Sequence, residues 1–354
     1  MGDTVSLSIS NGMKKIRVAV NGCGRIGRAF LKVAAQRPEI ELVAANDIAD
    51  FENIVYLLSH DSIYGKSPIS VGHGGDGKTL VLGSNAFRYF SEKEPEKLLW
   101  KELDVDVVVE STGLFASCEK ASVHCRAGAK RVVITAPIKD ESVVTNSATI
   151  LMGLNEDRFA GTTITSNASC TTNAASPLLA ILDEAIGIEK AVLNTVHGYT
   201  ASQALVDGPS KRGFREGRAA AVNIVPSSTG AAIAVTKALP KFENLFDGIS
   251  IRVPVPAGSI VDVTFIAKRQ TTAEEVNAAL KKAALEERWK KVFSVTEEEL
   301  VSSDIVGTPY ASIADLTLTR VVGGNLVKVM AWYDNEMGYA YALVEHVIKA
   351  GSSL

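Results

Sequence analysis

In the first part of the chain, apolar residues come in short, nearly uninterrupted runs separated by segments with helical spacing. The runs are rich in β-branched residues, which is typical of parallel strands buried on both faces. They lie at 16–21, 41–46, 105–110 and 131–135. Between them, segments 28–35 and 118–127 have the spacing of helices, and Gly128 ends the second. Up to about residue 166 the pattern predicts alternating strands and helices around a parallel sheet.

Beyond Cys170 the pattern changes. The strand-like runs at 249–253 and 260–266 alternate apolar and polar residues, as antiparallel strands with one solvated or interface face do. Helical spacing recurs at 230–239, 272–287 and 336–349. We therefore predict an α/β protein with two parts, a Rossmann-type parallel-sheet domain followed by an α+β domain with a mostly antiparallel sheet.

Composition narrows the class of protein only slightly. A chain of 354 residues can bury two cores, and 46% hydrophobic with 22% charged residues is ordinary for a soluble globular protein. A net charge of −3 argues against a general nucleic-acid surface. No apolar run is as long as a membrane span, and no signal peptide is visible. We expect no membrane association, and we interpret the polar residues 1–13 as a flexible extension or the product of an alternative start.

A glycine-rich turn follows the first strand directly. Gly22, Gly24 and Gly27 form the pattern G-x-G-x-x-G, with a helical segment after it. Such glycines permit a tight turn and a close approach of a pyrophosphate to a helix N-terminus. Asp47 ends the second strand about 20 residues further on, where an acid binds the ribose hydroxyls of NAD and repels a 2′-phosphate. A purely structural glycine turn is the alternative, and the flanking strand, helix and acid favour dinucleotide binding.

Cys170 is the candidate nucleophile. It lies in Ser-Asn-Ala-Ser-Cys-Thr-Thr-Asn (166–173), and the apolar run after it places the thiol near a helix N-terminus, where a thiolate is favoured. His197 follows the strand-like run 191–196, and a cysteine and a histidine far apart in sequence can meet as an activated pair. The alternative is a buried structural cysteine. The four cysteines show no disulfide spacing, so a reducing, cytoplasmic environment fits best.

These motifs resemble those of the phosphorylating glyceraldehyde-3-phosphate dehydrogenases. The resemblance extends from about Lys14 to Ala350, and its motifs follow one another in the family's order. They are Asn-Gly-Cys-Gly-Arg-Ile-Gly-Arg (21–28), Glu-Ser-Thr-Gly-Leu-Phe (110–115), residues 166–173, Ser-Ser-Thr-Gly-Ala-Ala (227–232), Arg-Val-Pro (252–254) and Trp-Tyr-Asp-Asn-Glu (332–336).

The resemblance implies a fold, a reaction and an assembly. It implies an NAD-binding domain over 1–169, completed by a C-terminal helix within 335–354, and a catalytic domain over 170–334. The implied reaction oxidises D-glyceraldehyde 3-phosphate with NAD and inorganic phosphate to 1,3-bisphosphoglycerate through a cysteine thioester, as in glycolysis and gluconeogenesis. The implied assembly is a homotetramer. Residues 208–218 resemble the loop that lines a neighbouring subunit's cofactor in the family, and Arg215 lies within them.

The resemblance also assigns the site residues. Cys170 is the nucleophile and His197 the base. The cofactor residues are Gly22, Gly24 and Gly27 in the turn, Arg25 and Ile26 at the pyrophosphate, Asp47 at the adenosine ribose, Lys93 near the adenine, Thr135 and Asn335 around the nicotinamide, Tyr339 against its ring, and Thr112, which is given no position along the cofactor. The sugar-phosphate site is assigned to Thr200, Ser202 and Arg252, and the inorganic-phosphate site to Ser169, Thr229, Gly230 and Arg215, with Thr171 beside Cys170.

Three features depart from the family pattern, and three other readings stay open. Ala174 stands where many members have a second cysteine, Cys23 stands where phenylalanine is common, and 139–152 is longer than usual. The remaining histidines show no ligand spacing, so we expect no metal.

The alternative functions are an erythrose-4-phosphate dehydrogenase, an aspartate-semialdehyde dehydrogenase, and an NAD-binding thiol redox sensor. Asp47 and the paired phosphate residues argue against the second of these, and the intact catalytic residues make the third a side role.

Overall fold

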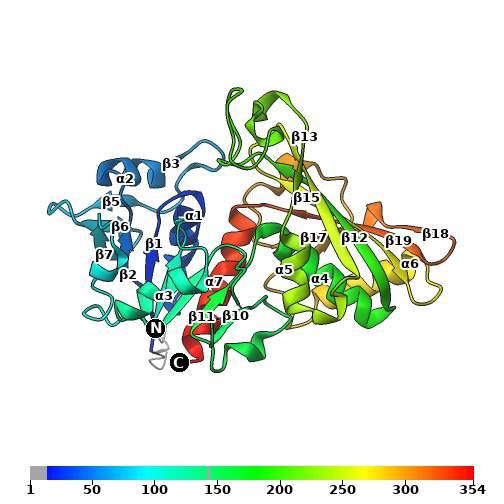
Figure 1. The fold of residues 1–354 in the computed structure, drawn as a ribbon, viewed down its shortest axis with the longest axis horizontal. Helices are drawn as coiled ribbons and strands as arrows, with labels where there is room; N and C mark the ends of the chain where they lie inside the picture. The colour runs from blue at the N-terminus through cyan, green and yellow to red at the C-terminus, as the bar shows by residue number, and fades with distance from the viewer. Residues whose placement is uncertain (1–13, 142–143) are drawn as a thin grey trace, which may run out of the picture.

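The computed structural model describes residues 14–141 and 144–354 and contains two large sheets there (Figure 1). Within these residues the first sheet is nine-stranded, and it is parallel except for its β7, β6 and β5 edge. Its strands, in spatial order, are β10 (Ser147–Thr149), β11 (Ile164–Ser166), β9 (Arg131–Ile134), β8 (Val107–Glu110), β1 (Ile16–Asn21), β2 (Ile40–Asn46), β7 (Asn85–Phe90), β6 (Thr79–Leu82) and β5 (Val71–His73). The predicted parallel sheet is confirmed.

The central strands are continuously apolar because helices or loops cover both faces. Val18 and Val20 of β1 pack with α1 (Arg25–Ala34) and α7 (Met337–Ser352), whereas Ala19 packs on the opposite side against Trp100. Further along that opposite face, α3 (Cys118–Arg126) covers β9 and β11. The last helix, α7, thus lies on the first sheet although its sequence follows the second (Figure 1).

The helix after the glycine turn begins earlier than predicted. We expected it to start at residue 28, but α1 starts at Arg25, with Gly24 as an extended N-cap that has no side chain to offer. The second half of the glycine pattern is therefore helical. The free N–H groups in the first turn of α1 therefore lie directly at the glycine turn, which is where an anion is bound.

The second sheet is eight-stranded within the described residues and mostly antiparallel, as predicted. In spatial order it contains β13 (Val225–Ser228), β14 (Phe246–Val253), β12 (Ile188–Gly198), β15 (Ser259–Ala267), β19 (Leu326–Tyr333), β17 (Ser312–Asp315) and β16 (Phe293–Thr296), with β18 (Arg320–Val322) on β19. The helices α4 (Cys170–Ala185), α5 (Ala231–Ala238) and α6 (Ala273–Ala284) share a core with its inner face. The β12–β14 and β16–β17 pairs are parallel.

Several short elements were not predicted from the pattern. They are α2 (Phe51–Ser59), the β3 (His60–Asp61) and β4 (Gly65–Lys66) pair, and the antiparallel β5–β6–β7 edge. The long connection 139–152 contains β10, which pairs with β11. With two or three residues each, β3, β4, β5 and β10 are too short for a hydrophobic period to identify.

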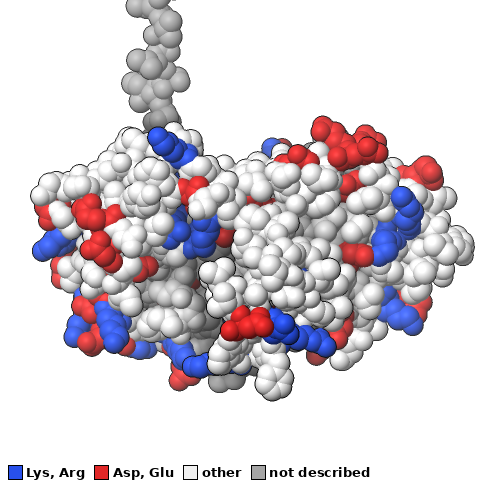
Figure 2. Space-filling model, turned by 90° about the horizontal axis from the view of Figure 1, so that it is seen from above, with Lys and Arg blue, Asp and Glu red and all other residues white. Residues whose placement is uncertain are grey.

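Residues 1–13, interpreted above as an extension, lie outside the described part of the chain. Across 14–141 and 144–354 no helix is long and apolar enough to cross a membrane, and no group of His, Cys, Asp or Glu side chains is gathered as a metal site. On the face shown in Figure 2, Lys and Arg side chains lie among Asp and Glu side chains and form no continuous basic surface.

Candidate active site

A strained turn presents the thiol of Cys170. The turn leaves β11 at Ser166, and Ala168 takes a positive φ of 51°. The Ser166 hydroxyl accepts the Ala168 N–H at 2.9 Å and donates to the Ala136 carbonyl at 2.6 Å. The Tyr339 hydroxyl donates to the Ala168 carbonyl at 3.1 Å. Because a positive φ in a non-glycine residue persists only where its surroundings hold it, these bonds fix the turn that leads to the nucleophile.

Cys170 is the first residue of α4, as the sequence predicted, and its Sγ lies 3.4 Å from Nε2 of His197. His197 lies near the end of β12, and its Nδ1 is 2.6 Å from the Gly198 carbonyl oxygen. When Nδ1 carries the hydrogen and donates it there, Nε2 has a free lone pair facing the thiol. That tautomer can accept the thiol proton.

Arg252 reaches the same imidazole from the neighbouring strand. It is the register partner of His197 in the parallel β12–β14 pair, and its Nη1 lies 2.6 Å from Nδ1. The same Nη1 also donates to the Gly198 carbonyl at 3.3 Å. Nδ1 can donate to Gly198 in one tautomer or accept from Arg252 in the other, but not both. Arg252 therefore competes for the nitrogen that sets the tautomer.

Burial controls the charge of both groups. It raises the pKa of the Cys170 thiol, and the Arg252 guanidinium and hydrogen bonds from Thr171 act in the opposite direction. Burial, followed by Arg252, lowers the pKa of His197 to about 3, against a smaller opposing effect of the Gly198 carbonyl. The sequence suggested a thiolate from the helix terminus alone. In the folded chain desolvation is the larger effect, so the resting pair is a thiol and a neutral imidazole.

Tyr333 contacts the residues on both sides of the catalytic pair. Its hydroxyl lies 2.9 Å from the hydroxyl of Thr171 and 2.8 Å from that of Thr195, and its ring packs edge-on against His197 at 5.8 Å. The side chain is 1% exposed. It thus connects the first turn of α4 to the strand that carries the base.

The glycine turn has the form that a dinucleotide requires. A Cβ on Gly22 would lie 2.6 Å from the Thr112 nitrogen, and one on Gly27 would lie 1.9 Å from the Gly22 carbonyl oxygen. A Cβ on Gly24 would meet nothing within 4 Å, so this residue is open to a ligand. Beside it lies a cavity of about 280 Å³ lined by Asp47, Lys93 and Thr112, among others. The turn, the free helix terminus and the acid fit an NAD molecule.

Asp47 is held in place before any ligand arrives. Its Oδ2 accepts the Cys23 N–H at 2.6 Å and its Oδ1 accepts the Ala49 N–H at 2.9 Å. A carboxylate has about four acceptor positions, so capacity remains for ribose hydroxyls. The Arg25 side chain points elsewhere, to Glu336 at 2.8 Å and Asp61 at 2.7 Å. The backbone N–H groups of Arg25 and Ile26 therefore remain free to bind a pyrophosphate.

The comparisons with known proteins agree with this geometry. Residues 16–118 match the model of the glyceraldehyde 3-phosphate dehydrogenase NAD binding domain, and residues 169–335 match the model of the C-terminal domain. A glyceraldehyde-3-phosphate dehydrogenase of Mycobacterium tuberculosis (strain ATCC 25618 / H37Rv) is 46% identical over 346 residues, which is 96% of this chain and 99% of the relative. One of Streptomyces coelicolor is 44% identical over 342 residues, with the same coverage.

The chain belongs to the glyceraldehyde-3-phosphate dehydrogenase family. Members of this family are NAD-dependent oxidoreductases, and NAD is the cofactor that the matched domain binds. The structure gives local contacts for three of the residues that the sequence assigned to phosphate. The Thr200 and Ser202 hydroxyls are 2.9 Å apart, and Ser169 caps α4 by accepting the Thr172 N–H at 3.1 Å.

The remaining phosphate residues lie at a second helix terminus and on an exposed loop. Gly230 is the N-cap of α5, and the Thr229 hydroxyl accepts the Ala231 N–H at 3.1 Å. Arg215 is solvent-exposed in a short helical turn, Arg215–Gly217. A helix N-terminus with a hydroxyl beside it has donors that suit an oxyanion.

The residues expected at the nicotinamide come from both parts of the chain: Thr135 follows a strand of the first sheet, Asn335 follows β19 of the second, and Tyr339 is on α7. Asn335 is 5% exposed, and its Oδ1 accepts the Ser259 hydroxyl at 3.0 Å. Thr135 directly follows β9, and its hydroxyl donates to the Glu110 carbonyl at 3.2 Å. Tyr339 is buried in the core beneath the first sheet and reaches the Ala168 carbonyl, as described above.

Sequence reasoning missed the residues that position the others. Ser259 orients Asn335, Tyr333 contacts one threonine beside the nucleophile and one on the strand of the base, and Glu336 with Asp61 holds Arg25. No spacing rule links these partners, because they lie on different elements far apart in the chain. The one available signal was that Tyr333 and Glu336 fall within the Trp-Tyr-Asp-Asn-Glu motif.

Proposed function

We propose that this chain catalyses the phosphorylating oxidation of D-glyceraldehyde 3-phosphate with NAD and inorganic phosphate to 1,3-bisphosphoglycerate. The observation that carries the proposal is the 3.4 Å approach of the Cys170 thiol to His197 Nε2 at the N-terminus of α4. A partly buried thiol beside a neutral imidazole is a nucleophile–base pair. The mechanism follows from what each group can do.

Cys170 acts first. His197 Nε2 takes the thiol proton as Sγ adds to the aldehyde carbon, and it returns that proton to the new oxygen, which gives a hemithioacetal. The Cys170 N–H at the helix terminus stabilises the oxygen while it carries negative charge. Nε2 takes the proton again when the carbon is oxidised, and a thioester remains on Sγ.

NAD, when bound, supplies the hydride acceptor. The free N–H groups at the start of α1 hold its pyrophosphate, Asp47 holds its adenosine ribose, and Asn335 holds its carboxamide. Ser259 keeps the Asn335 amide oriented by donating to Oδ1 at 3.0 Å, which leaves the amide N–H₂ free for a carbonyl. Lys93, Thr112, Thr135 and Tyr339 complete the set that we assign to the cofactor.

Two anion sites serve the two phosphates. We assign the phosphate of the aldehyde to Thr200, Ser202 and Arg252, and the attacking inorganic phosphate to Ser169, Thr229, Gly230 and Arg215. Arginine forks and hydroxyls suit both ions. Inorganic phosphate attacks the thioester carbon, the Cys170 sulfur leaves, and an acyl phosphate is released.

A phosphate-dependence assay tests the function. Reduction of NAD is measured with glyceraldehyde 3-phosphate and with erythrose 4-phosphate, each with and without inorganic phosphate. The expected result is a strict need for inorganic phosphate and a higher kcat/KM with the three-carbon aldehyde. A preference for erythrose 4-phosphate would establish the alternative dehydrogenase. Activity with neither aldehyde, together with NAD binding and reversible oxidation of Cys170, would favour the redox-sensing alternative.

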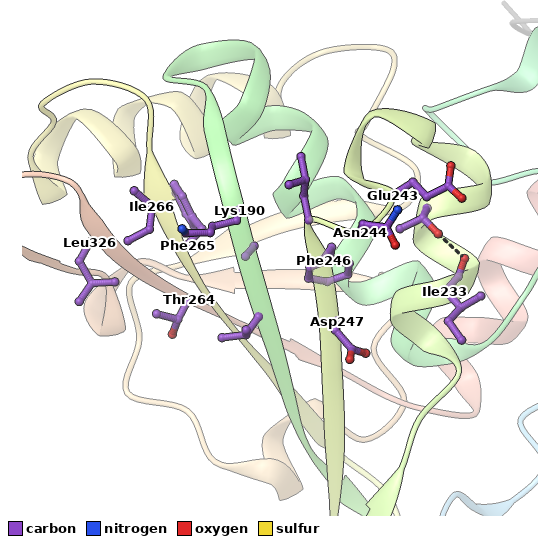
Figure 3. Close-up of a pocket in the computed structure, with 14 residues that line it drawn as sticks. Lys190, Ile233, Glu243, Asn244, Phe246, Asp247, Thr264, Phe265, Ile266 and Leu326 are labelled. Atoms are coloured by element: carbon purple, nitrogen blue, oxygen red, sulfur yellow. Dashed lines mark hydrogen bonds between the residues drawn. The ribbon is translucent and has the colours of Figure 1, made fainter.

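We propose a homotetramer as the working form, because two separate surfaces expose apolar side chains. One is the outer face of the second sheet, where a cavity of about 840 Å³ lies over β12, β14 and β15, with Ile233 of α5 and Leu326 of β19 at its two ends (Figure 3). On this face Val192 is 60% exposed, and Ile233, at the edge of the cavity, is 64% exposed. Single proteins seldom leave so much apolar surface free.

The second surface is the loop region 199–224 between β12 and β13. Its exposed apolar side chains are Leu205, Val206, Phe214, Val222 and Ile224, of which Phe214 is 99% exposed. Two different self-associating surfaces on one chain close into a dimer of dimers. If the loop meets a neighbour's cofactor site, NAD stabilises the tetramer by mass action.

The domain boundaries and the location are proposed with the function. The NAD-binding domain comprises residues 1–169 and the C-terminal helix within 335–354, because α7 shares the core of the first sheet. The catalytic domain comprises residues 170–334. A cytoplasmic location suits the chemistry, since Cys170 must remain reduced to act as a nucleophile.

A further inference from the structure

A fully buried polar network lies behind the glycine turn and the cavity beside it. The mechanism above does not use this network. His124 on α3 and Glu110 at the end of β8 are 0% and 2% exposed, and His124 Nε2 lies 2.9 Å from Glu110 Oε2. Trp100, also fully buried, lies on the other side of the imidazole, with its Nε1 3.1 Å from His124 Nδ1. The three side chains form a chain of hydrogen bonds closed off from solvent.

Trp100 determines which nitrogen of His124 carries the hydrogen. An indole N–H can only donate, so Nδ1 must accept. The single hydrogen of the neutral ring therefore sits on Nε2, where it faces Glu110. Trp100 thus fixes His124 as a permanent hydrogen-bond donor to Glu110. Residues that do not touch a ligand commonly orient the residues of its site in this way.

Every acceptor position of Glu110 is filled. Oε2 accepts from His124 Nε2 and from Asn21 Nδ2 at 2.6 Å, and Oε1 accepts from the Thr112 N–H at 2.8 Å and from the Thr112 hydroxyl. Four donors match the roughly four lone-pair positions of a carboxylate. Loss of the His124 donor leaves a buried acceptor unpaired, and Glu110 must move or recruit water.

The residues that Glu110 holds line the cavity beside Gly24, which we call the adenosine cavity. Thr112 and Asn21 both line it, and the Asn21 oxygen in turn accepts the Asn46 amide at 2.7 Å. Asn46 fixes the Glu92 backbone, accepting its N–H at 2.8 Å, and both residues also line the cavity. Asp47 follows Asn46 directly in the chain. The network therefore reaches β1, β2, β8 and the loop after β7, which together surround the ligand.

We propose that His124 is a positioning residue for the adenosine half of NAD: through Glu110 it holds Thr112, Asn21 and Asn46 in the arrangement that binds the ligand. The inference rests on the proposed use of NAD. It assigns His124 no contact with the cofactor and no part in the chemical steps. Its effect is on affinity for any ligand that contains the adenosine and pyrophosphate groups.

The test is binding of ADP-ribose to the full-length chain, measured by titration calorimetry. His124→Leu removes both hydrogen bonds at similar volume, and the dissociation constant should rise about tenfold, the effect of one unpaired buried acceptor. His124→Gln keeps an amide oxygen for Trp100 and an amide N–H for Glu110, so it should bind within about threefold of the parent chain. The kcat at saturating NAD should stay unchanged in both variants.

His346→Leu is the matched control. His346 is equally buried, on α7, and its Nε2 lies 2.7 Å from the Thr165 hydroxyl, away from the cavity. This variant should lose thermal stability and keep its ADP-ribose affinity. If His124→Leu does not fold, Trp100→Phe removes the indole N–H together with the pyrrole part of the buried ring, and it should weaken ADP-ribose binding by about threefold, the effect of one lost hydrogen bond.

Three results with the variants would overturn the inference. They are a folded His124→Leu that binds ADP-ribose like the parent, a glutamine variant no better than the leucine variant, and a His346→Leu that weakens binding as much. A parent chain that binds no ADP-ribose would also overturn it. Failure of the proposed function is distinguishable, because absence of aldehyde oxidation leaves the ADP-ribose titrations intact.

Discussion

Nη1 of Arg252 lies 2.6 Å from Nδ1 of His197, and the two residues are register partners on neighbouring parallel strands. The residue assigned to the substrate phosphate therefore touches the ring assigned as the base. A phosphate that draws the guanidinium toward itself leaves Nδ1 free to donate to the Gly198 carbonyl, which fixes the tautomer with an accepting Nε2. Substrate recognition and readiness of the base are thus connected through one arginine.

The first prediction concerns the nucleophile. Cys170→Ser should lower kcat by at least about 10³-fold, because an alcohol is far less ionised than a thiol near neutral pH. His197→Asn should retain weak activity, about 10²- to 10⁴-fold below the parent chain, because the thiol remains while its base is lost. Steady-state kinetics with NAD titrations on both variants measure this. Near-parental turnover in Cys170→Ser would refute the assignment, and unchanged NAD affinity serves as the control for folding.

The second prediction concerns the pH at which the thiol reacts. Arg252 lowers the pKa of Cys170, so Arg252→Gln should raise it and leave less thiolate at any given pH. Alkylation by the uncharged reagent iodoacetamide should then slow at pH 8, with its profile displaced to higher pH. Arg269→Gln is the control, because Arg269 is an exposed arginine paired with Glu275 outside the site. An alkylation profile that does not move would rule out this influence of Arg252 on the thiol.

A third prediction follows from two buried histidines. Burial lowers the pKa of both His197 and His346 to about 3, below the value of 6.5 for the unfolded chain. The unfolded state therefore binds more protons between pH 6.5 and 3, and the stability that these neutral rings contribute is full above pH 6.5 and falls as the pH drops. Each ring should cost up to about 1.4 kcal/mol per pH unit in that window.

Denaturant unfolding at pH 7, 6, 5 and 4 measures this slope. His346→Gln removes one of the two titrating rings and should flatten the dependence on pH, whatever its effect at pH 7. The surface variant His60→Gln is the control and should leave the slope unchanged. An equally steep slope in His346→Gln would contradict the prediction for that ring.

The fourth prediction concerns the choice of cofactor. Asp47 is held against the glycine turn by the Cys23 N–H, so its charge lies where a ribose phosphate would come. The parent chain should prefer NAD to NADP, and Asp47→Gly should narrow the ratio of kcat/KM values without creating good NADP use, since no positive contact is gained. Asp50→Asn removes a nearby charge from the N-cap of α2 and should not change the ratio. Measured preference of the parent chain for NADP would refute the role of Asp47.

The sequence predicted the parts of the fold that repeat a period or use a special residue. The strands β1, β2, β8 and β9 are long enough for burial on both faces to leave an apolar run, and the glycines of the turn have no substitute where a Cβ would meet backbone. The start of α1 was missed by three residues, from 28 to 25, because Gly24 caps the helix with backbone conformation alone. Propensity does not register such a cap.

The site was predictable as a set of residue types and not as an electrostatic environment. The motif located Cys170 at a helix terminus, which favours a thiolate, but it contained no measure of burial, and desolvation raises the thiol pKa. Likewise His124 had no neighbour in sequence that marked it. Its partners Trp100 and Glu110 meet it only when α3 packs on the sheet. Contacts of that kind depend on tertiary packing, which local patterns do not encode.

The last prediction concerns assembly. If the outer sheet face and the 199–224 loops are two distinct interfaces, Ile249→Lys on the sheet and Phe214→Asp on the loop should each shift a tetramer toward dimers, because each buries a charge in one apolar contact. Leu285→Lys changes another exposed apolar residue, just after α6 and outside both surfaces, and should leave the tetramer intact. Light scattering and sedimentation at low protein concentration, with and without NAD, give the masses of the assemblies.

NAD should oppose the dissociation of the parent chain upon dilution, since a ligand that binds the assembled site stabilises the assembly. A parent chain that is monomeric and fully active when diluted would defeat both the tetramer and the role of the loop at a neighbour's cofactor.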